Sequence, residues 1–373
     1  MISEIDWIDN EGALDLMVEE VGGVPVLRVE EGLVLELRSI EKLMCELAGS
    51  KGFLFTSFTC KRDGVKVKAE KLGRYFVGKL KRGKGMLEQY FPSHEVNPYV
   101  EVFFRSVDRV NDLHSLKVWP TLCNGAAEAF LVRMNILVEF VRLELSSDAF
   151  KGVLKRFRKA SLKRINSLEG YIDALFAQHS RMLVVRVDLS YQSGFVSGRE
   201  DFYSDVKKVK AHWAKMQKDL HKGIPVDGLL GFACKLEYGQ LKGFHFHLLL
   251  FYNGSNHRQD GVLARMVGEY WRDSITAGAG RYFNCNAVKE KYRYLGVGMI
   301  SFNQLDRVSA LKNRVASYLT KVDYWIRLSP ESGRSFFRGN MPKLKSVKRG
   351  RPRAPGPVQA APDRKSTRLN SSH

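Results

Sequence analysis

The second half of the chain carries the clearest patterns of apolar and polar positions. Apolar residues at helical spacing predict helices over residues 200–221, 261–275 and 306–326. Alternating or continuously apolar runs predict strands over residues 182–191, 228–238 and 244–252, with a further strand before residue 298. The order strand, helix, strand, strand, helix, strand, helix favours an α+β fold. We expect an antiparallel sheet with helices on one face, of the split β-α-β kind.

The first half of the chain follows mainly helical patterns. Helices are expected over residues 33–47, 126–145 and 148–161, the last continuing to residue 178, and a hairpin is expected over residues 53–69. We therefore divide the chain into an α-rich region, residues 1–178, and a second domain, residues 179–340. The first region shows no recognisable catalytic pattern, and its role stays open.

Charge narrows the class of partner. The 373 residues carry a net charge of +20, which argues for an anionic polymer, and nucleic acid is the simplest one. The five cysteines are scattered without a Cys-x-x-Cys pair, which fits a reducing compartment. The sequence shows neither a long apolar stretch nor a signal peptide, so we expect a cytoplasmic protein without a membrane partner.

The end of the chain is set apart by its composition. Residues 341–362 are rich in Lys, Arg, Pro and Gly and are expected to form a basic disordered tail. Residues 363–373 look like the translation of a sequencing-adapter oligonucleotide, so no inference about fold or function rests on them. The natural C-terminus is expected to differ. The strong positive charge remains without this segment.

Two histidines stand one residue apart in the most apolar strand. Since positions i and i+2 of a strand share a face, His245 and His247 present two imidazoles side by side. Such a pair on a rigid strand can bind a divalent metal, and Glu237, across the hairpin turn, could add a carboxylate. The alternative is a pair of core histidines with satisfied ring nitrogens.

A tyrosine and a lysine share one face of the last predicted helix. Tyr318 and Lys321 are three residues apart. After a His-x-His strand, Tyr318 is a candidate nucleophile for cutting a DNA strand through a phosphotyrosine, and Lys321 could stabilise the developing charge. Tyr324 is the rival nucleophile, but it lies about 240° further round the helix, which favours a one-tyrosine enzyme. The alternative for Tyr318 is a packing role.

Cations and aromatic rings alternate shortly before the last helix. A single-strand channel uses charge for the backbone and rings for the bases, and this stretch fits that use. A basic strand edge with half-buried tyrosines is the alternative. The candidate DNA-binding residues are Lys289, Lys291, Tyr292, Arg293 and Tyr294.

Together these motifs resemble those of HUH rolling-circle replication initiators. Residues 181–353 look like the inovirus gene-two protein family, which shares the domain named for YagK and YfjJ. The resemblance implies a nicking-joining enzyme at a phage origin that uses Mg²⁺ or Mn²⁺. It implies His245 and His247 as metal ligands, Tyr318 as nucleophile with Lys321 beside it, and Glu237 as a less regularly spaced ligand. Arg186 and Asp188 depart from the small polar residues common in the first motif.

The main hypothesis is therefore a phage or prophage replication initiator that nicks and joins single-stranded origin DNA. The alternative is a non-catalytic DNA-binding prophage regulatory protein. A relaxase or transposase of the same superfamily is a third option, with His257 as its nearby candidate for a third histidine. The sequence lacks a Gly-x-x-x-x-Gly-Lys-Ser/Thr loop, so unwinding and synthesis would fall to a host helicase and polymerase. The origin sequence, metal preference and oligomeric state stay open.

Overall fold

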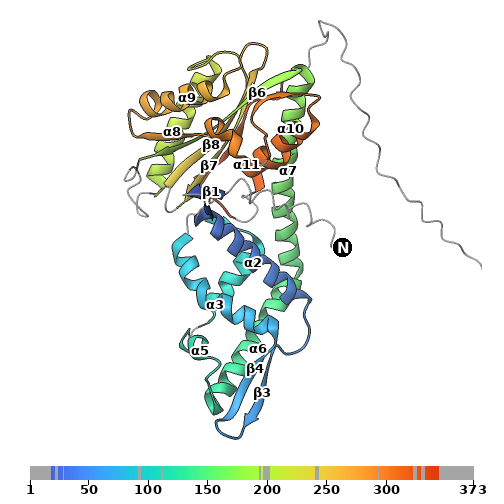
Figure 1. Cartoon of the computed structure of the whole chain (residues 1–373). Coiled ribbons are helices and arrows are strands. Elements are labelled where there is room, and N and C mark those ends of the chain that lie inside the picture. Colours follow the sequence, from blue (N-terminus) through green and yellow to red (C-terminus); the bar gives the residue numbers. More distant parts are fainter. Residues whose placement is uncertain are drawn as a thin grey trace, which may run out of the picture.

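A helical N-terminal part and a sheet-containing C-terminal part make up the molecule (Figure 1). The computed structural model describes residues 18–21, 24–27, 29–90, 94–110, 113–192, 195, 202–239, 243–292, 294–321, 326–328 and 332–343. The predicted basic tail beyond Lys343 and the adapter-like segment lie outside these residues. None of the described helices combines the length and the apolar character that crossing a membrane requires.

The N-terminal part is helical, as predicted, and includes small strand pairs. Its core gathers the apolar faces of the helices, with Ile40, Phe76, Phe103 and Val138 fully or almost fully buried. The expected hairpin is confirmed. The elements are β1 (Val18–Val21), β2 (Val24–Leu27), α2 (Val29–Gly49), β3 (Phe55–Cys60), β4 (Gly64–Ala69), α3 (Lys71–Tyr90), β5 (His94–Val96), α4 (Pro98–Asp108), α5 (Leu113–Val118) and α6 (Asn124–Ser146).

Helix α7 (Asp148–Gln178) runs from the N-terminal part to the sheet without a break. The Ser147 hydroxyl caps its start by accepting from the Phe150 backbone N–H at 3.1 Å. Its first half contributes Phe157 to the N-terminal core, and its second half contributes Ile172 to the core under the sheet. At 1.5 Å per residue the helix is about 46 Å long, so a single continuous helix contributes side chains to both cores.

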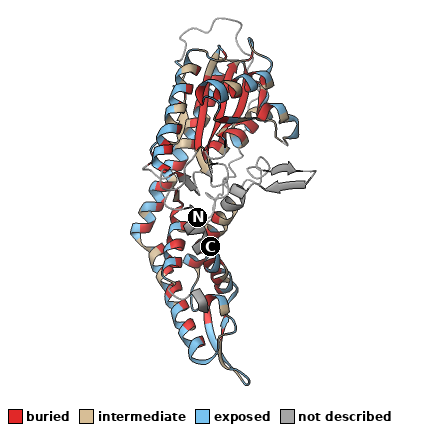
Figure 2. Ribbon diagram, turned by 90° about the vertical axis from the view of Figure 1, so that its left-hand side faces the viewer, coloured by how far each residue is buried: buried red, intermediate tan, exposed pale blue. Residues whose placement is uncertain are grey.

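The C-terminal part is built on a six-stranded antiparallel sheet with the order β10-β6-β8-β7-β12, where β12 is Phe336–Arg338, and β9 also pairs with β6. Its central strands are almost wholly buried (Figure 2). Residues 261–284 form a helix followed by a strand, and a short 3₁₀ segment separates β9 from β10. The elements are β6 (Arg181–Tyr191), α8 (Phe202–His221), β7 (Leu229–Gly239), β8 (Gly243–Asn253), α9 (Asp260–Tyr270), η1 (Trp271–Ile275), β9 (Gly280–Asn284), η2 (Cys285–Lys291) and β10 (Gly298–Ser301).

The α+β class with an antiparallel sheet is confirmed, but helices cover both faces of the sheet rather than one. Helices α8 and α9 pack on the face that carries Phe246 and Leu248. Helix α7 and the last helices pack on the face that carries Leu249 and Phe251. Both faces of β8 are apolar over residues 248–252, so neither face can be left to water.

The end of the fold differs from the single helix predicted over residues 306–326. That stretch forms α10 (Leu305–Ala310), a π-helical turn η3 (Leu311–Ala316) and α11 (Ser317–Lys321). Strand β11 (Ile326–Leu328) then pairs with β5 of the N-terminal part, and β12 (Phe336–Arg338) pairs with β7. These strands of three residues are set by their distant partners, which a local pattern does not reveal.

Candidate metal and nucleophile site

One glutamate and two histidines meet on the hairpin of β7 and β8. Glu237 stands directly opposite His245 in the strand register, and His247 follows two residues on, on the same face. A ligand atom from each of the three lies within 4.8 Å of the other two. The imidazoles are buried, with 5% and 2% of His245 and His247 exposed. The structure thus brings together the three residues predicted as metal ligands.

Both imidazoles turn the same nitrogen towards Glu237. His245 Nδ1 lies 3.1 Å from the Gly243 carbonyl oxygen, which leaves Nε2 at 3.5 Å from Glu237 Oε2. His247 Nδ1 lies 2.9 Å from Asp188 Oδ1, and its Nε2 is 3.4 Å from the same Glu237 oxygen. An acceptor at each Nδ1 fixes the tautomer in which Nε2 carries a lone pair, as in metal sites.

The polar atoms at the centre of the cluster fit a bound cation. Among the described residues, neither Glu237 Oε1 nor His247 Nε2 has a hydrogen-bond partner, although both atoms are buried. Unsatisfied buried polar atoms of this kind call for an explanation such as an ion. Ligand atoms that each lie about 2.1 Å from one ion are separated by about 3.0–3.4 Å. The two distances from Glu237 Oε2, 3.5 Å to His245 Nε2 and 3.4 Å to His247 Nε2, are close to that range, so these residues suit a divalent metal.

Asp188 and Arg186 support the cluster from the neighbouring strand β6. Asp188 is the register partner of His247, and Arg186 Nε lies 3.3 Å from Asp188 Oδ1. The Arg186 backbone N–H donates to Asn286 Oδ1 at 2.7 Å, and Asn286 Nδ2 donates to the Val184 carbonyl at 3.0 Å. Asn286 thereby replaces strand pairing in the gap between β9 and β10, and it holds β6 in line beside the site.

The cluster is charged in the absence of metal. Burial opposes the ionised form of Asp188, but Arg186 and His247 outweigh burial and hold the pKa of that carboxyl well below its usual range. Burial also opposes ionised Glu237, yet the two histidines hold its pKa well below its usual value. For His247, burial is outweighed by the two carboxylates, which raise its pKa to about 9. A divalent cation could replace the Nε2 proton on the Glu237 side of the ring, while Asp188 stays at Nδ1.

Tyr318 lies beside this cluster. Its half-buried ring packs edge-on against His247 with 5.0 Å between ring centroids. The Arg186 guanidinium carbon lies 5.0 Å from the centre of the Tyr318 ring. The next residue, Leu319, is buried in the core under the sheet, and this anchors α11. The sequence-predicted nucleophile and the three predicted ligands therefore occupy one site.

The other predicted residues of the last helix are only partly placed. Lys321 is the final residue of α11, and its side chain lies outside the described part of the structure. Tyr324, the rival nucleophile, lies entirely outside the described residues. His257 packs its ring on Tyr252 with 5.4 Å between centroids, on the opposite face of β8 from the histidine pair. It is not part of the cluster.

The candidate DNA-binding residues divide by their surroundings. Lys289 Nζ lies 2.7 Å and 2.9 Å from the two carboxylate oxygens of Asp260, a partly buried ion pair. Lys291 is exposed at the end of η2, and the Tyr294 ring lies 4.5 Å from the Arg314 guanidinium carbon. Burial raises the pKa of Tyr292, which neighbours Cys285 and Arg186. Arg293 lies outside the described residues. Their role in DNA binding stays a prediction.

Three residues that sequence reasoning did not assign to the site also line it. Asp188 and Arg186 come from β6, and Lys235 stands opposite His247 on β7, buried, with its Nζ 3.2 Å from Ser335 Oγ. The signal that could have found them is the strand register. A polar residue every second position on three adjacent strands marks one face.

Comparison with known proteins finds one family. The model of the YagK/YfjJ C-terminal domain matches residues 150–336, which include the cluster and Tyr318. No curated protein and no solved structure matches the chain.

Proposed function

The chain belongs to the YagK/YfjJ C-terminal domain family, and from this premise we propose that it nicks and rejoins single-stranded DNA through a phosphotyrosine intermediate. The family points to a prophage-associated protein. The natural role for such an enzyme is to start rolling-circle replication at the prophage's own origin. Mg²⁺ or Mn²⁺ would be held by Glu237, His245 and His247.

The observation that carries this proposal is the position of Tyr318 against His247. The 5.0 Å between the ring centroids of Tyr318 and His247, a member of the Glu-His-His cluster, supports Tyr318 as a nucleophile beside a proposed cation site. Core histidines would have satisfied ring nitrogens, but the buried Nε2 of His247 lacks a hydrogen-bond partner among the described residues. The net charge of +20 suits a DNA substrate.

The chemistry follows from the groups in place. When bound, the cation supplies charge that polarises a non-bridging oxygen of the scissile phosphate. Tyr318 Oη attacks the phosphorus, the bond to O3′ breaks, and the phenol proton passes to water while O3′ takes one up. The buried Arg186 guanidinium, beside the Tyr318 ring, stabilises negative charge on the phenolate. Asp188 orients both Arg186 and His247. The reverse attack by a 3′ hydroxyl rejoins the strand.

The test is a covalent-adduct assay. The protein is incubated with labelled single-stranded oligonucleotides from its own prophage intergenic region, in Mn²⁺ or in EDTA, and run on a denaturing gel. We expect a DNA-linked species in Mn²⁺ alone, with the label mapping to Tyr318. Tyr318→Phe abolishes the adduct, whereas Tyr203→Phe, the same change on an exposed tyrosine of α8, leaves it at the wild-type level.

Other outcomes would revise the proposal. An adduct on Tyr324 would move the nucleophile, and an adduct formed in EDTA would remove the metal from the step. Tight DNA binding without an adduct under either metal would favour the non-catalytic regulatory protein. In that case His245→Ala leaves DNA affinity unchanged.

A further inference from the structure

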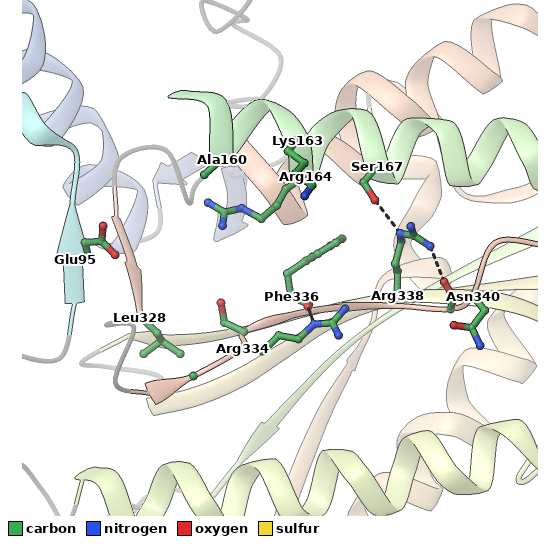
Figure 3. Close-up of a pocket in the computed structure, with 13 residues that line it drawn as sticks. Glu95, Ala160, Lys163, Arg164, Ser167, Leu328, Arg334, Phe336, Arg338 and Asn340 are labelled. Atoms are coloured by element: carbon green, nitrogen blue, oxygen red, sulfur yellow. Dashed lines mark hydrogen bonds between the residues drawn. The ribbon is translucent and has the colours of Figure 1, made fainter. Parts of the chain in front are cut away.

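A pocket of about 670 Å³ lies where α7 faces the edge of the sheet (Figure 3). We call it the junction pocket. Its upper wall is α7, which contributes Lys163, Arg164 and Ser167, and its lower wall is β12 with the residues just before it, which contribute Arg334 and Phe336. Strands β5 and β11 close one end, so both parts of the molecule contribute to it.

The lining of the junction pocket is strongly cationic. Two basic residues come from each wall, Lys163 and Arg164 from the helix and Arg334 and Arg338 from the strand side. Glu95 is the one acidic residue among the described residues of the lining. Such an excess of positive charge in a concave site favours an anionic ligand.

The two strand-side arginines are held by neutral groups. Arg338 Nε donates to Ser167 Oγ at 2.9 Å, and Arg334 Nε donates to the Phe336 carbonyl at 2.6 Å. These bonds fix the guanidinium groups in place without neutralising them. Fixed, charged donors that face a cavity are suited to phosphate oxygens.

An aromatic ring stands between these cations. Phe336 is half-buried and projects from β12 towards α7, between the charged side chains of the two walls (Figure 3). A ring among cations is the combination that binds single-stranded nucleic acid, because the ring stacks on a base while the cations contact its phosphates. A free inorganic anion would gain nothing from the ring.

The pocket and the metal cluster share one face of the sheet. Phe336 is the register partner of Lys235, and Lys235 is the register partner of His247. Directly paired residues point to the same face, and two strand spacings amount to about 10 Å. DNA bound in the junction pocket would therefore lie on the same side of the sheet as the cluster, about two strands away.

We propose that the junction pocket binds the single-stranded DNA that flanks the scissile phosphate, with a base on Phe336 and phosphates on Lys163, Arg164 and Arg334. This rests on the proposed function for the identity of the DNA. It gives α7 a role in substrate binding, and it makes the edge strand β12 part of the binding surface.

The experiment measures affinity for a labelled single-stranded oligonucleotide by fluorescence anisotropy, with the full chain in EDTA. Lys163→Glu and Arg334→Glu change exposed side chains and are each expected to weaken binding at least about tenfold. Lys68→Glu, an exposed lysine on β4 in the distant hairpin, makes the same charge change and stays within twofold. Phe336→Leu keeps an apolar side chain but loses the ring, and it is expected to cost at least about fivefold.

Salt dependence separates specific binding of phosphates from general charge. Removing one cation that neutralises a phosphate should lower the slope of log affinity against log salt by about 0.7 for a single strand. Lys163→Gln with Arg334→Gln should lower it by about 1.4, while Lys68→Gln leaves it unchanged. Pocket variants that bind like the Lys68 variants, or a duplex that competes as well as the single strand, overturn the proposal.

The readout needs neither metal nor Tyr318, so its result is separate from the adduct assay. If the wild type forms the adduct but the pocket variants bind DNA normally, the proposed role of the pocket is wrong and the proposed nicking activity is unaffected. Selective loss of single-strand affinity in the pocket variants, without an adduct in the wild type, supports the pocket and overturns the nicking activity.

Discussion

At the residue scale, the site is a set of buried charges that fix one another. Asp188 holds His247 on one side and Arg186 on the other, while Glu237 faces both histidines. The Asp188–His247 pair has the form of a carboxylate that orients a metal-binding imidazole. We therefore expect each of these side chains to affect binding of the proposed metal ion, whether or not it contacts the ion.

We predict that metal binding releases a proton from His247. Its pKa of about 9 in the metal-free chain means that the ring is protonated at pH 7.5, and a metal must displace that proton. Affinity for Mn²⁺ should rise as the pH increases towards 9. Titration calorimetry at pH 7.5 in buffers of different ionisation enthalpy should show close to one proton released, and His247→Gln should show none. Equal heats in all buffers would contradict this.

A second prediction concerns Asp188, which contacts His247 but is not part of the ligand cluster. Asp188→Asn removes the charge that orients His247, so Mn²⁺ affinity should fall by about 10- to 100-fold. Asp173→Asn, on the exposed ion pair between α7 and Lys312, should leave metal affinity unchanged. Calorimetry measures both variants. Unchanged affinity in Asp188→Asn would show that His247 is oriented by other contacts.

At the element scale, α7 and β7 approach so closely that glycine is required. A Cβ at Gly231 of β7, or at Gly339 just after β12, would overlap the Tyr171 hydroxyl. The register of β7 against β8 shifts next to Gly231. The strand is therefore irregular where the helix rests on it, and the regular pairing of Glu237 with His245 begins beyond that point.

We predict that Gly231→Ala lowers the free energy of unfolding by about 1–3 kcal/mol, because the new methyl group overpacks the contact with Tyr171. Tyr171→Phe removes the clashing oxygen, so the cost should be smaller in that background, as a double-mutant cycle would show. Gly170→Ala on α7 meets nothing within 4 Å and should be neutral or stabilising. Urea unfolding gives all the values. If the effects of Gly231→Ala and Tyr171→Phe are additive, the destabilisation by Gly231→Ala does not come from the contact with Tyr171.

The hairpin of β7 and β8 could be predicted from sequence because its apolar run is local and a short loop joins its strands. Strands β5, β11 and β12 could not, since three residues carry little pattern and their partners are far away in the chain. The sequence places Asp188 in a predicted strand, but its contact with His247 could not be predicted, because it depends on the pairing of β6 with β8. Such pairing belongs to tertiary structure, and a single sequence does not contain it.

At the scale of the whole molecule, α7 joins two cores. Its second half covers Ala233, Leu249 and Phe251 on one face of the sheet. The domain boundary between residues 178 and 179 remains a prediction. A boundary there would separate the second half of α7 from the sheet face that it covers. The family match begins at residue 150, within the first turn of α7.

We therefore predict that a fragment of residues 160–343 unfolds cooperatively, whereas a fragment of residues 179–343 aggregates or binds hydrophobic dyes. The shorter fragment leaves a large apolar face of the sheet exposed to water. Circular dichroism during heating and dye fluorescence distinguish the two. If the shorter fragment is equally soluble and cooperative, the division at residue 178 is a true domain boundary.

The pairing of β5 with β11 has a consequence for how the chain folds. It joins Val96 to Ile326, so the N-terminal part acquires this strand pair only after nearly the whole C-terminal part has been synthesised. Closing so long a loop is entropically costly and slow. We expect this strand pair to form last. The amides of β5 should therefore reach their final protection against hydrogen exchange only after the C-terminal part has folded.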